Sequence, residues 1–308
     1  MDTEHLYITY EMSPAPPAII GWEDYEALAA ARWQALLTAG GRADLPRIRD
    51  FLIKHPSFVP GATGALNPSR NEPCRSALLA LSPLREWITA EDRYRDVSTV
   101  EVPDFIWLAH NSEHLTPVLI KIESPSKKWF TDRGDPHDDL LRAINHLREW
   151  QDWLSQPRAI TAFHANFDTP SSFRRHGEFR PDFVLIYGRE GEFKERPRLA
   201  RLRSQFQRDN QIVVTFDGLK AARDCAGYIC ISQRGDRFRA LSIPPTMRLG
   251  PSIAGAWHGI DGLPDAVMAN EWISPERKQF LIERLPYWQR WATSPKRIPY
   301  YVNLEDWE

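Results

Sequence analysis

The sequence is poor in cysteine, nearly neutral in net charge and free of long apolar runs. Its three cysteines, Cys74, Cys225 and Cys230, show no Cys-x-x-Cys spacing, which argues against a disulfide scaffold and against a zinc ribbon. We therefore expect a reducing, cytoplasmic environment. Lysine plus arginine number 39 and aspartate plus glutamate 41, so the formal charge is −2. This charge excludes a globally basic nucleic-acid coat protein but leaves room for local basic patches.

Several common signals of function or location are also missing. Residues 1–12 are acidic and lack the basic and apolar regions of a signal peptide, and no apolar stretch approaches the roughly 18 residues of a membrane span. We find no Walker-type phosphate loop, no Gly-x-Gly-x-x-Gly motif and no His-Glu-x-x-His motif. Nucleotide-driven, dinucleotide-dependent and zinc-dependent chemistry therefore have no support, and we expect no membrane partner.

The sequence does contain enough apolar material for a folded core. Of its 308 residues, 42% are hydrophobic and 26% are charged. That length is typical of about two domains, or of one domain with accessory elements. We expect an N-terminal arm and helix (1–40), a core (41–225) and a C-terminal extension made of a hairpin and a helix (226–308).

The first half of the core predicts a hairpin followed by a helix. Two short apolar runs, residues 103–108 and 117–123, are separated by a polar turn, which is typical of a β-hairpin. The helix that follows ends near Leu154. Asp135 is its expected N-cap and Pro136 its first helical residue, since proline is favoured at that position.

The second half of the core predicts a strand, a helix and a strand. These are expected at residues 183–188, within 194–208 and at 211–216, and this order indicates a right-handed parallel crossover. The predicted fold class is therefore α/β, with a mixed sheet flanked by helices on both faces. The elements expected outside this unit are helices at 21–39, 44–55 and 275–293 and a hairpin at 228–243.

The strongest candidate site combines Asp104 with Lys121 and Glu123. Residues two apart on a strand point to one face, so Lys121 and Glu123 project together, and Asp104 joins them if the two strands pair. Two carboxylates can bind a hard cation such as Mg²⁺ through oxygen, and an ammonium can orient water or stabilise developing charge. This is the logic of phosphodiester hydrolysis. The alternative is a surface salt bridge on an exposed strand face, and spacing alone does not decide between the two.

At this point the sequence resembles a known family, the Shedu family of bacterial anti-phage nucleases. The resemblance is carried, in order along the chain, by DFLIKHPSFVPG, PDFIW, TPVLIKIESPSKKWF, AINHLREWQDWL, FVLIYGR and IVVTFDGL, and it covers roughly residues 45–220. It implies a PD-(D/E)xK nuclease core, metal-dependent DNA cleavage and a role in phage defence. In the family motif the first acid corresponds to Asp104.

The sequence departs from the family pattern at the second half of the motif. The family has an acid, one intervening residue and then a lysine, whereas here Lys121 occupies the acid position and Glu123 the lysine position. A glutamine that the family often carries on the following helix corresponds to His146. In one interpretation the two charges have exchanged places and the site works. In the other the site has decayed and the protein binds DNA or a partner without cutting. Lys127 or Lys128 could supply an ammonium in either case.

Two further features are a second match to the motif and a basic stretch. A literal second match, Asp182 followed by Glu192 and Lys194, lies where a loop is expected rather than a buried strand. The stretch 194–208 carries six basic residues and one acidic residue, and as a helix face it could contact DNA phosphates or simply face solvent.

The function that we predict is metal-dependent endonucleolytic cleavage of DNA in anti-phage defence. Asp104, Lys121 and Glu123 are the expected catalytic residues. Asp104 and Glu123 are the expected ligands of Mg²⁺ or Mn²⁺. DNA is the expected partner, a homo-oligomer is left open, and the alternative is a catalytically degenerate nuclease fold that binds without cleavage.

Overall fold

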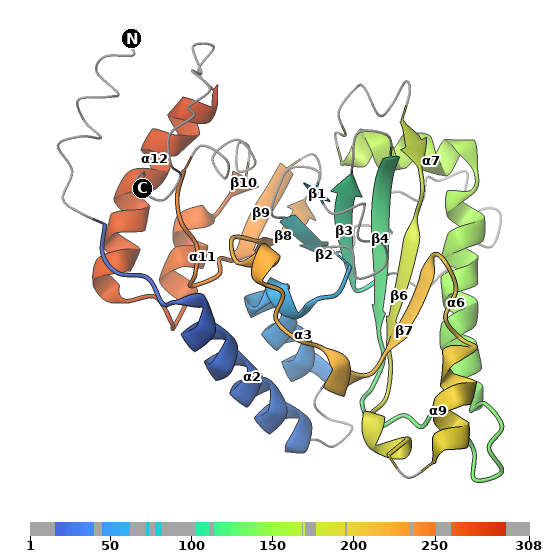
Figure 1. Ribbon diagram of the computed structural model, residues 1–308. Helices are drawn as coiled ribbons and strands as arrows, with labels where there is room; N and C mark the ends of the chain where they lie inside the picture. The colour runs from blue at the N-terminus through green and yellow to red at the C-terminus, as the bar shows by residue number, and fades with distance from the viewer. Residues whose placement is uncertain are drawn as a thin grey trace.

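The structure is a computed structural model built around one mixed β-sheet. It describes residues 16–39, 45–61, 72–73, 78–81, 103–110, 114–167, 169, 177–194, 196–234, 237–250 and 260–293. Within these residues ten strands belong to the sheet, and the main path runs β10-β9-β8-β2-β3-β4-β6-β7 (Figure 1). The predicted α/β class with a mixed sheet between helices is confirmed.

The elements have the following bounds. The strands are β1 (Glu72–Pro73), β2 (Leu78–Leu81), β3 (Phe105–His110), β4 (His114–Ile122), β5 (Glu178–Phe179), β6 (Asp182–Ile186), β7 (Gln211–Val214), β8 (Ile229–Arg234), β9 (Arg237–Ser242) and β10 (Ile260–Asp261). The described α-helices are α2 (Trp22–Thr38), α3 (Leu45–Lys54), α6 (Asp138–Leu154), α7 (Pro157–Asn166), α9 (Pro197–Ser204), α11 (Leu263–Ala269) and α12 (Pro275–Thr293). Single turns of 3₁₀-helix are η2 (Pro56–Phe58), η4 (Glu190–Glu192), η5 (Phe216–Gly218) and η6 (Arg223–Cys225).

The predicted pairings of the core are present. β3 and β4 form the expected antiparallel hairpin, with Phe105 opposite Ile120. β4, β6 and β7 run parallel to one another, and α9 lies between β6 and β7 in the chain, as a crossover requires. The helix of this crossover is shorter than the predicted stretch, because it begins only at Pro197 and ends at Ser204.

The predicted start of α6 is wrong. Pro136 forms an isolated β-bridge with Phe130, so it belongs to an extended segment and not to the first helical turn. The N-cap is His137, whose Nδ1 accepts a hydrogen bond from the backbone N–H of Asp139 at 3.3 Å. Asp135 is therefore not the cap, and the helix begins two residues later than the proline signal indicates. Its acidic first turn remains, because Asp138 and Asp139 still face the positive end of the helix dipole.

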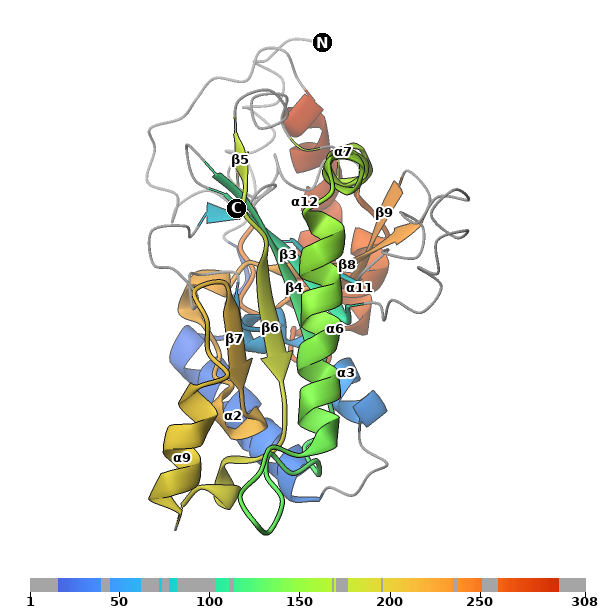
Figure 2. The same cartoon turned by 90° about the vertical axis from the view of Figure 1, so that its right-hand side faces the viewer.

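Both faces of the sheet are buried, as β6 shows. Phe183 and Leu185 pack in the cluster that contains the inner face of α6, whereas Val184 and Ile186 pack in the cluster that contains α2 and α3. Figure 2 shows α6 along one face of the sheet, with α2 and α3 behind it. Because apolar side chains alternate between two covered faces, the central strands read as nearly continuous apolar runs. The tryptophans Trp150, Trp153 and Trp288 are buried in the core.

The segment predicted as a C-terminal extension continues the same sheet. β8 pairs in parallel with β2, and β8 and β9 form the expected hairpin, with Gln233 opposite Phe238. α11 and α12 then pack on the face that also carries α6. None of the described helices combines the length and the apolar character that crossing a membrane requires.

A buried polar cluster joins the N-terminal helices to the segment between α11 and α12. The hydroxyl of Tyr25 on α2 lies 3.2 Å from Nδ1 of His55 and 2.9 Å from Oγ of Ser57. The His55 ring also packs 4.8 Å from the ring of Trp272. Burial lowers the pKa of His55 from 6.5 to about 4, and the nearby cations of Arg32 and Lys54 add to the effect. His55 is therefore neutral in the folded protein near neutral pH.

This histidine should make the free energy of unfolding depend on pH. The unfolded chain binds a proton near pH 6.5 and the folded chain only near pH 4, so stability is complete above pH 6.5 and is lost as the pH falls toward 4. The expected loss by pH 4 is about 3 kcal/mol. Urea unfolding at several pH values measures it. His55→Gln, which does not titrate, should flatten the profile between pH 6.5 and 4, and equal slopes for the two proteins would contradict the assignment.

Candidate active site

Asp104 lies at the end of the β3–β4 ladder and closes it with its side chain. Its backbone N–H donates to the carbonyl of Ile120 at 2.7 Å, and its Oδ2 accepts from the backbone N–H of Ile122 at 2.6 Å. Its Oδ1 forms an ion pair with Arg49 of α3 at 2.5 Å. The Asp104 side chain is only 10% exposed. The carboxylate is therefore fixed beside the last residue of β4.

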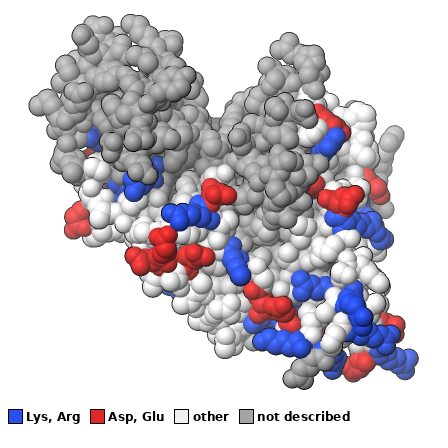
Figure 3. Space-filling model, in the orientation of Figure 1, with Lys and Arg blue, Asp and Glu red and all other residues white. Residues whose placement is uncertain are grey.

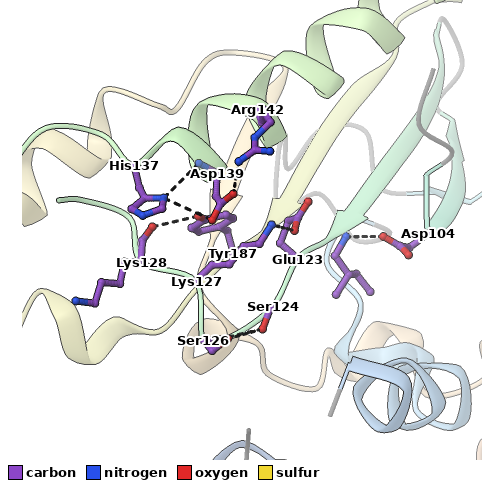
Figure 4. Close-up of polar contacts among 11 residues, drawn as sticks. Asp104, Glu123, Ser124, Ser126, Lys127, Lys128, His137, Asp139, Arg142 and Tyr187 are labelled. Atoms are coloured by element: carbon purple, nitrogen blue, oxygen red, sulfur yellow. Dashed lines mark hydrogen bonds and ion pairs between the residues drawn. The ribbon is translucent and has the colours of Figure 1, made fainter. Parts of the chain in front are cut away.

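Glu123 directly follows β4 and is held by a turn that folds back on it. Its backbone N–H donates to the carbonyl of Ile186, which continues the parallel β4–β6 pairing. Pro125 follows two residues later, and the backbone N–H of Lys127 donates to the carbonyl of Ser124. This turn brings Nζ of Lys127 to 2.6 Å from Oε2 of Glu123 (Figure 4).

The two carboxylates thus flank the end of β4. Asp104 binds the peptide N–H of Ile122, and Glu123 is the next residue, about 3.3 Å further along the strand direction. Figure 4 shows the side chains of Asp104 and Glu123 on either side of this point. Each carboxylate has a basic partner, Arg49 for the first and Lys127 for the second. That the two share one cation remains a prediction.

Lys121 is buried on β4, two residues before Glu123. It is 4% exposed and pairs in register with Leu185 of β6. Because Leu119 packs in the cluster under α6 while Ile120 and Ile122 pack in the opposite cluster, alternation places Lys121 on the α6 face. Its ammonium is accordingly much less accessible than that of Lys127, whose side chain is 31% exposed.

The N-terminus of α6 and Tyr187 border the same site. The Tyr187 hydroxyl donates to the carbonyl of Lys128 at 3.1 Å. Burial raises the pKa of Tyr187, and the carboxylates of Asp139, Glu123 and Glu192 raise it further. Figure 4 shows the ring of Tyr187 next to Asp139. Tyr187 has no signal of its own in the sequence, because it continues the apolar run of a buried strand.

The literal second match does not form a site. Asp182 begins β6 and is 3% exposed, whereas Glu192 lies beyond the other end of that strand, about 13 Å of strand length away. The Glu192 carboxylate has a structural task, because its two oxygens accept from the backbone N–H groups of Trp129 and Phe130 at 2.9 and 3.0 Å. The set of Asp182, Glu192 and Lys194 is therefore split by the fold.

Part of the basic face of α9 packs against aromatic rings. The guanidinium of Arg203 lies over the rings of Trp129 and Phe193, at 5.5 and 5.4 Å from their centroids. Arg198 and Arg201 are exposed on the same helix. Figure 3 shows Lys and Arg side chains gathered at the lower right, over α9 and the loops at that end of β6, with some acidic side chains among them.

The donor set at the end of β4 is small. Within the described part of the chain, no group of three or more His, Cys, Asp or Glu side chains is placed to hold a metal ion. Two carboxylates remain, Asp104 and Glu123, with Arg49, Lys121 and Lys127 around them. Mg²⁺ commonly takes one or two protein carboxylates and completes its shell with water and substrate phosphate, so this donor set fits that ion.

The order of these elements and motifs matches one known family. The family model described as Shedu protein SduA, C-terminal, matches residues 43–219. The chain belongs to the Shedu family. The matched region of this Shedu protein includes α3, the β3–β4 hairpin, α6 and the β6–α9–β7 crossover, and hence all of the candidate site. Family membership points to a role in anti-phage defence. No curated protein and no solved structure matches the chain.

Proposed function

We propose that this Shedu protein is a metal-dependent DNA endonuclease with a PD-(D/E)xK-type core that acts in anti-phage defence. The observation that carries the proposal is the hydrogen bond from Ile122 N–H to Asp104, which holds one carboxylate beside the residue that precedes the other, Glu123. The reaction is hydrolysis, in which a water oxygen bonds to phosphorus and the ester P–O bond to the leaving sugar oxygen breaks.

Asp104 and Glu123 are the residues that would hold Mg²⁺ or Mn²⁺. When bound, the cation supplies Lewis-acid polarisation of the phosphate and a water of lowered pKa. Arg49 and Lys127, which pair with these carboxylates, are then available to contact phosphate oxygens. Lys121 is buried on β4 two residues before Glu123. Lys127 is the more accessible of the two lysines and is therefore better placed to reach the substrate.

A non-cleaving DNA-binding module is the second candidate, and one observation favours it. Both oxygens of Asp104 already have partners within the protein, Arg49 and the Ile122 N–H, and Oε2 of Glu123 binds Lys127. A decayed site would keep such internal contacts, which compete with a cation for the same oxygens.

Incubation of the purified protein with supercoiled plasmid separates the two candidates. We expect nicked or linear plasmid in Mg²⁺ or Mn²⁺ and intact plasmid in a chelator. The double variant Asp104→Asn with Glu123→Gln removes both charges with little change of shape and should leave the plasmid intact in either metal. An inert wild type across both metals would select the binding module, and a cleaving double variant would place the active site elsewhere.

A further inference from the structure

A basic cavity adjoins the candidate site on the side of Lys127. It has a volume of about 630 Å³ and lies between two loops, 125–132 after β4 and 189–196 after β6. We call it the basic cavity. Its charged lining side chains are five basic residues and two acidic residues, namely Lys127, Lys128, Arg189, Lys194, Arg196, Asp132 and Glu192.

The loops that line the basic cavity are firmly held. Glu192 binds the backbone N–H groups of Trp129 and Phe130 and so ties one loop to the other. Tyr187 donates to the carbonyl of Lys128. Gly188 has φ of +57°, and a Cβ there would lie 2.7 Å from the carbonyl oxygen of Lys127, so the close approach of the loops requires glycine. A preformed cavity of this size is within the range of ligand sites, roughly 300–1,000 Å³.

The charge of the basic cavity is only partly neutralised. Lys127 pairs with Glu123, and Arg189 pairs with Asp217 at 2.7 Å. Both oxygens of Glu192 accept backbone N–H groups. Three exposed cations remain, Lys128, Lys194 and Arg196, and within the described residues none of their side chains makes a hydrogen bond or ion pair. Arg196 is also the N-cap residue of α9, where the helix dipole favours an anion.

We propose that the basic cavity binds a backbone phosphate of the DNA strand next to the bond that is cleaved. The proposal rests on the proposed function, because Lys127 belongs both to the cavity and to the Glu123 ion pair. When the scissile phosphate of a DNA strand lies at Glu123, the neighbouring phosphate of that strand therefore contacts Lys128, Lys194 and Arg196. These contacts read the backbone and give affinity without sequence preference.

Salt-dependent binding of a short fluorescent DNA duplex, measured in chelator so that no cleavage occurs, tests the proposal. The triple variant Lys128→Gln, Lys194→Gln, Arg196→Gln loses the contact with this one phosphate, so it should lower the slope of log affinity against log salt by about one and weaken binding about 10-fold near physiological salt. The matched control is Arg148→Gln, Arg248→Gln, Lys278→Gln, which removes the same charge from exposed positions on α6 and after β9 and from a half-buried position on α12. The control should leave the slope within about 0.3 of the wild-type value, because its side chains lie outside the basic cavity.

The design separates this proposal from the proposed function. If wild type binds DNA with a steep salt slope but never cleaves it, the assignment of cleavage fails. The salt slope of the triple variant still shows whether the cavity binds a DNA phosphate. If wild type cleaves, the triple variant should raise KM and leave kcat at saturating DNA within a few-fold, whereas Glu123→Gln should lower kcat and leave DNA affinity unchanged.

Two outcomes overturn the assignment of the cavity. One is a triple variant with the salt slope of the matched control. The other is direct binding of adenosine triphosphate to wild type and not to the triple variant, with DNA affinity equal in both proteins, which would make the cavity a free-nucleotide site. The thermal midpoint of each variant checks that it is folded, and exposed lysine and arginine side chains are expected to change it little.

Discussion

Glu123→Ala is expected to lower plasmid cleavage by at least about 100-fold while the protein stays folded. The substitution removes one of the two carboxylates proposed to hold the metal. The fold should tolerate it, because the backbone N–H of residue 123 still donates to the carbonyl of Ile186. The lost ion pair with Lys127 is near the surface and contributes at most about 1 kcal/mol. Initial rates of plasmid nicking and the thermal midpoint are the two measurements.

Lys127→Ala is the matched control for this experiment. It breaks the same ion pair but keeps the Glu123 carboxylate, so it separates loss of a ligand from loss of the pair. We expect it to cleave faster than Glu123→Ala. An active wild type that is indifferent to Glu123→Ala would rule out Glu123 as a metal ligand.

The exchange of charges at Lys121 and Glu123 can be reversed directly. The double change Lys121→Glu with Glu123→Lys rebuilds the acid-x-lysine order of the family. If the surroundings have adapted to the exchange, the double variant cleaves no faster than wild type. If the site has decayed, wild type is inert and the double variant gains activity. Lys121 is 4% exposed, so a glutamate there reaches the site only from a buried position.

Substitutions of Asp104 should separate its contribution to stability from its contribution to catalysis. Asp104→Ala leaves the backbone N–H of Ile122 without its acceptor and should lower the free energy of unfolding by about 1–3 kcal/mol, besides abolishing cleavage. Asp104→Asn keeps an oxygen that can accept from Ile122, so we expect it to recover most of the stability and none of the cleavage. Urea unfolding and plasmid nicking measure the two effects.

Arg49→Gln is the control for the ion pair at Asp104. The Arg49 side chain is 44% exposed, so its loss should cost less than about 1 kcal/mol of stability.

Full cleavage by Asp104→Asn would show that the negative charge at this position is not needed. Asp104 would then have only a structural part, as the residue whose carboxylate caps the end of the β3–β4 ladder.

Periodicity and local signals determined much of the fold. The apolar runs before and after the polar turn correctly predicted the β3–β4 hairpin. The order of apolar strand, basic helix and apolar strand correctly predicted the parallel crossover through α9. These patterns are local, because side-chain direction repeats every two residues on a strand and about every 3.6 on a helix. Asp104 and Glu123 could be named from the same patterns, since pairing of neighbouring strands brings their ends together.

Only the tertiary structure decided which groups surround those carboxylates. Arg49 comes from a helix 55 residues before Asp104 in sequence number. The turn after Pro125 selects Lys127 rather than Lys128 as the partner of Glu123. Pro136 pairs with Phe130 instead of starting α6, so the β-bridge between loop segments overrides the local preference of proline for the first helical turn. Contacts between segments far apart depend on packing of the whole core, and a single sequence carries no local signal for them.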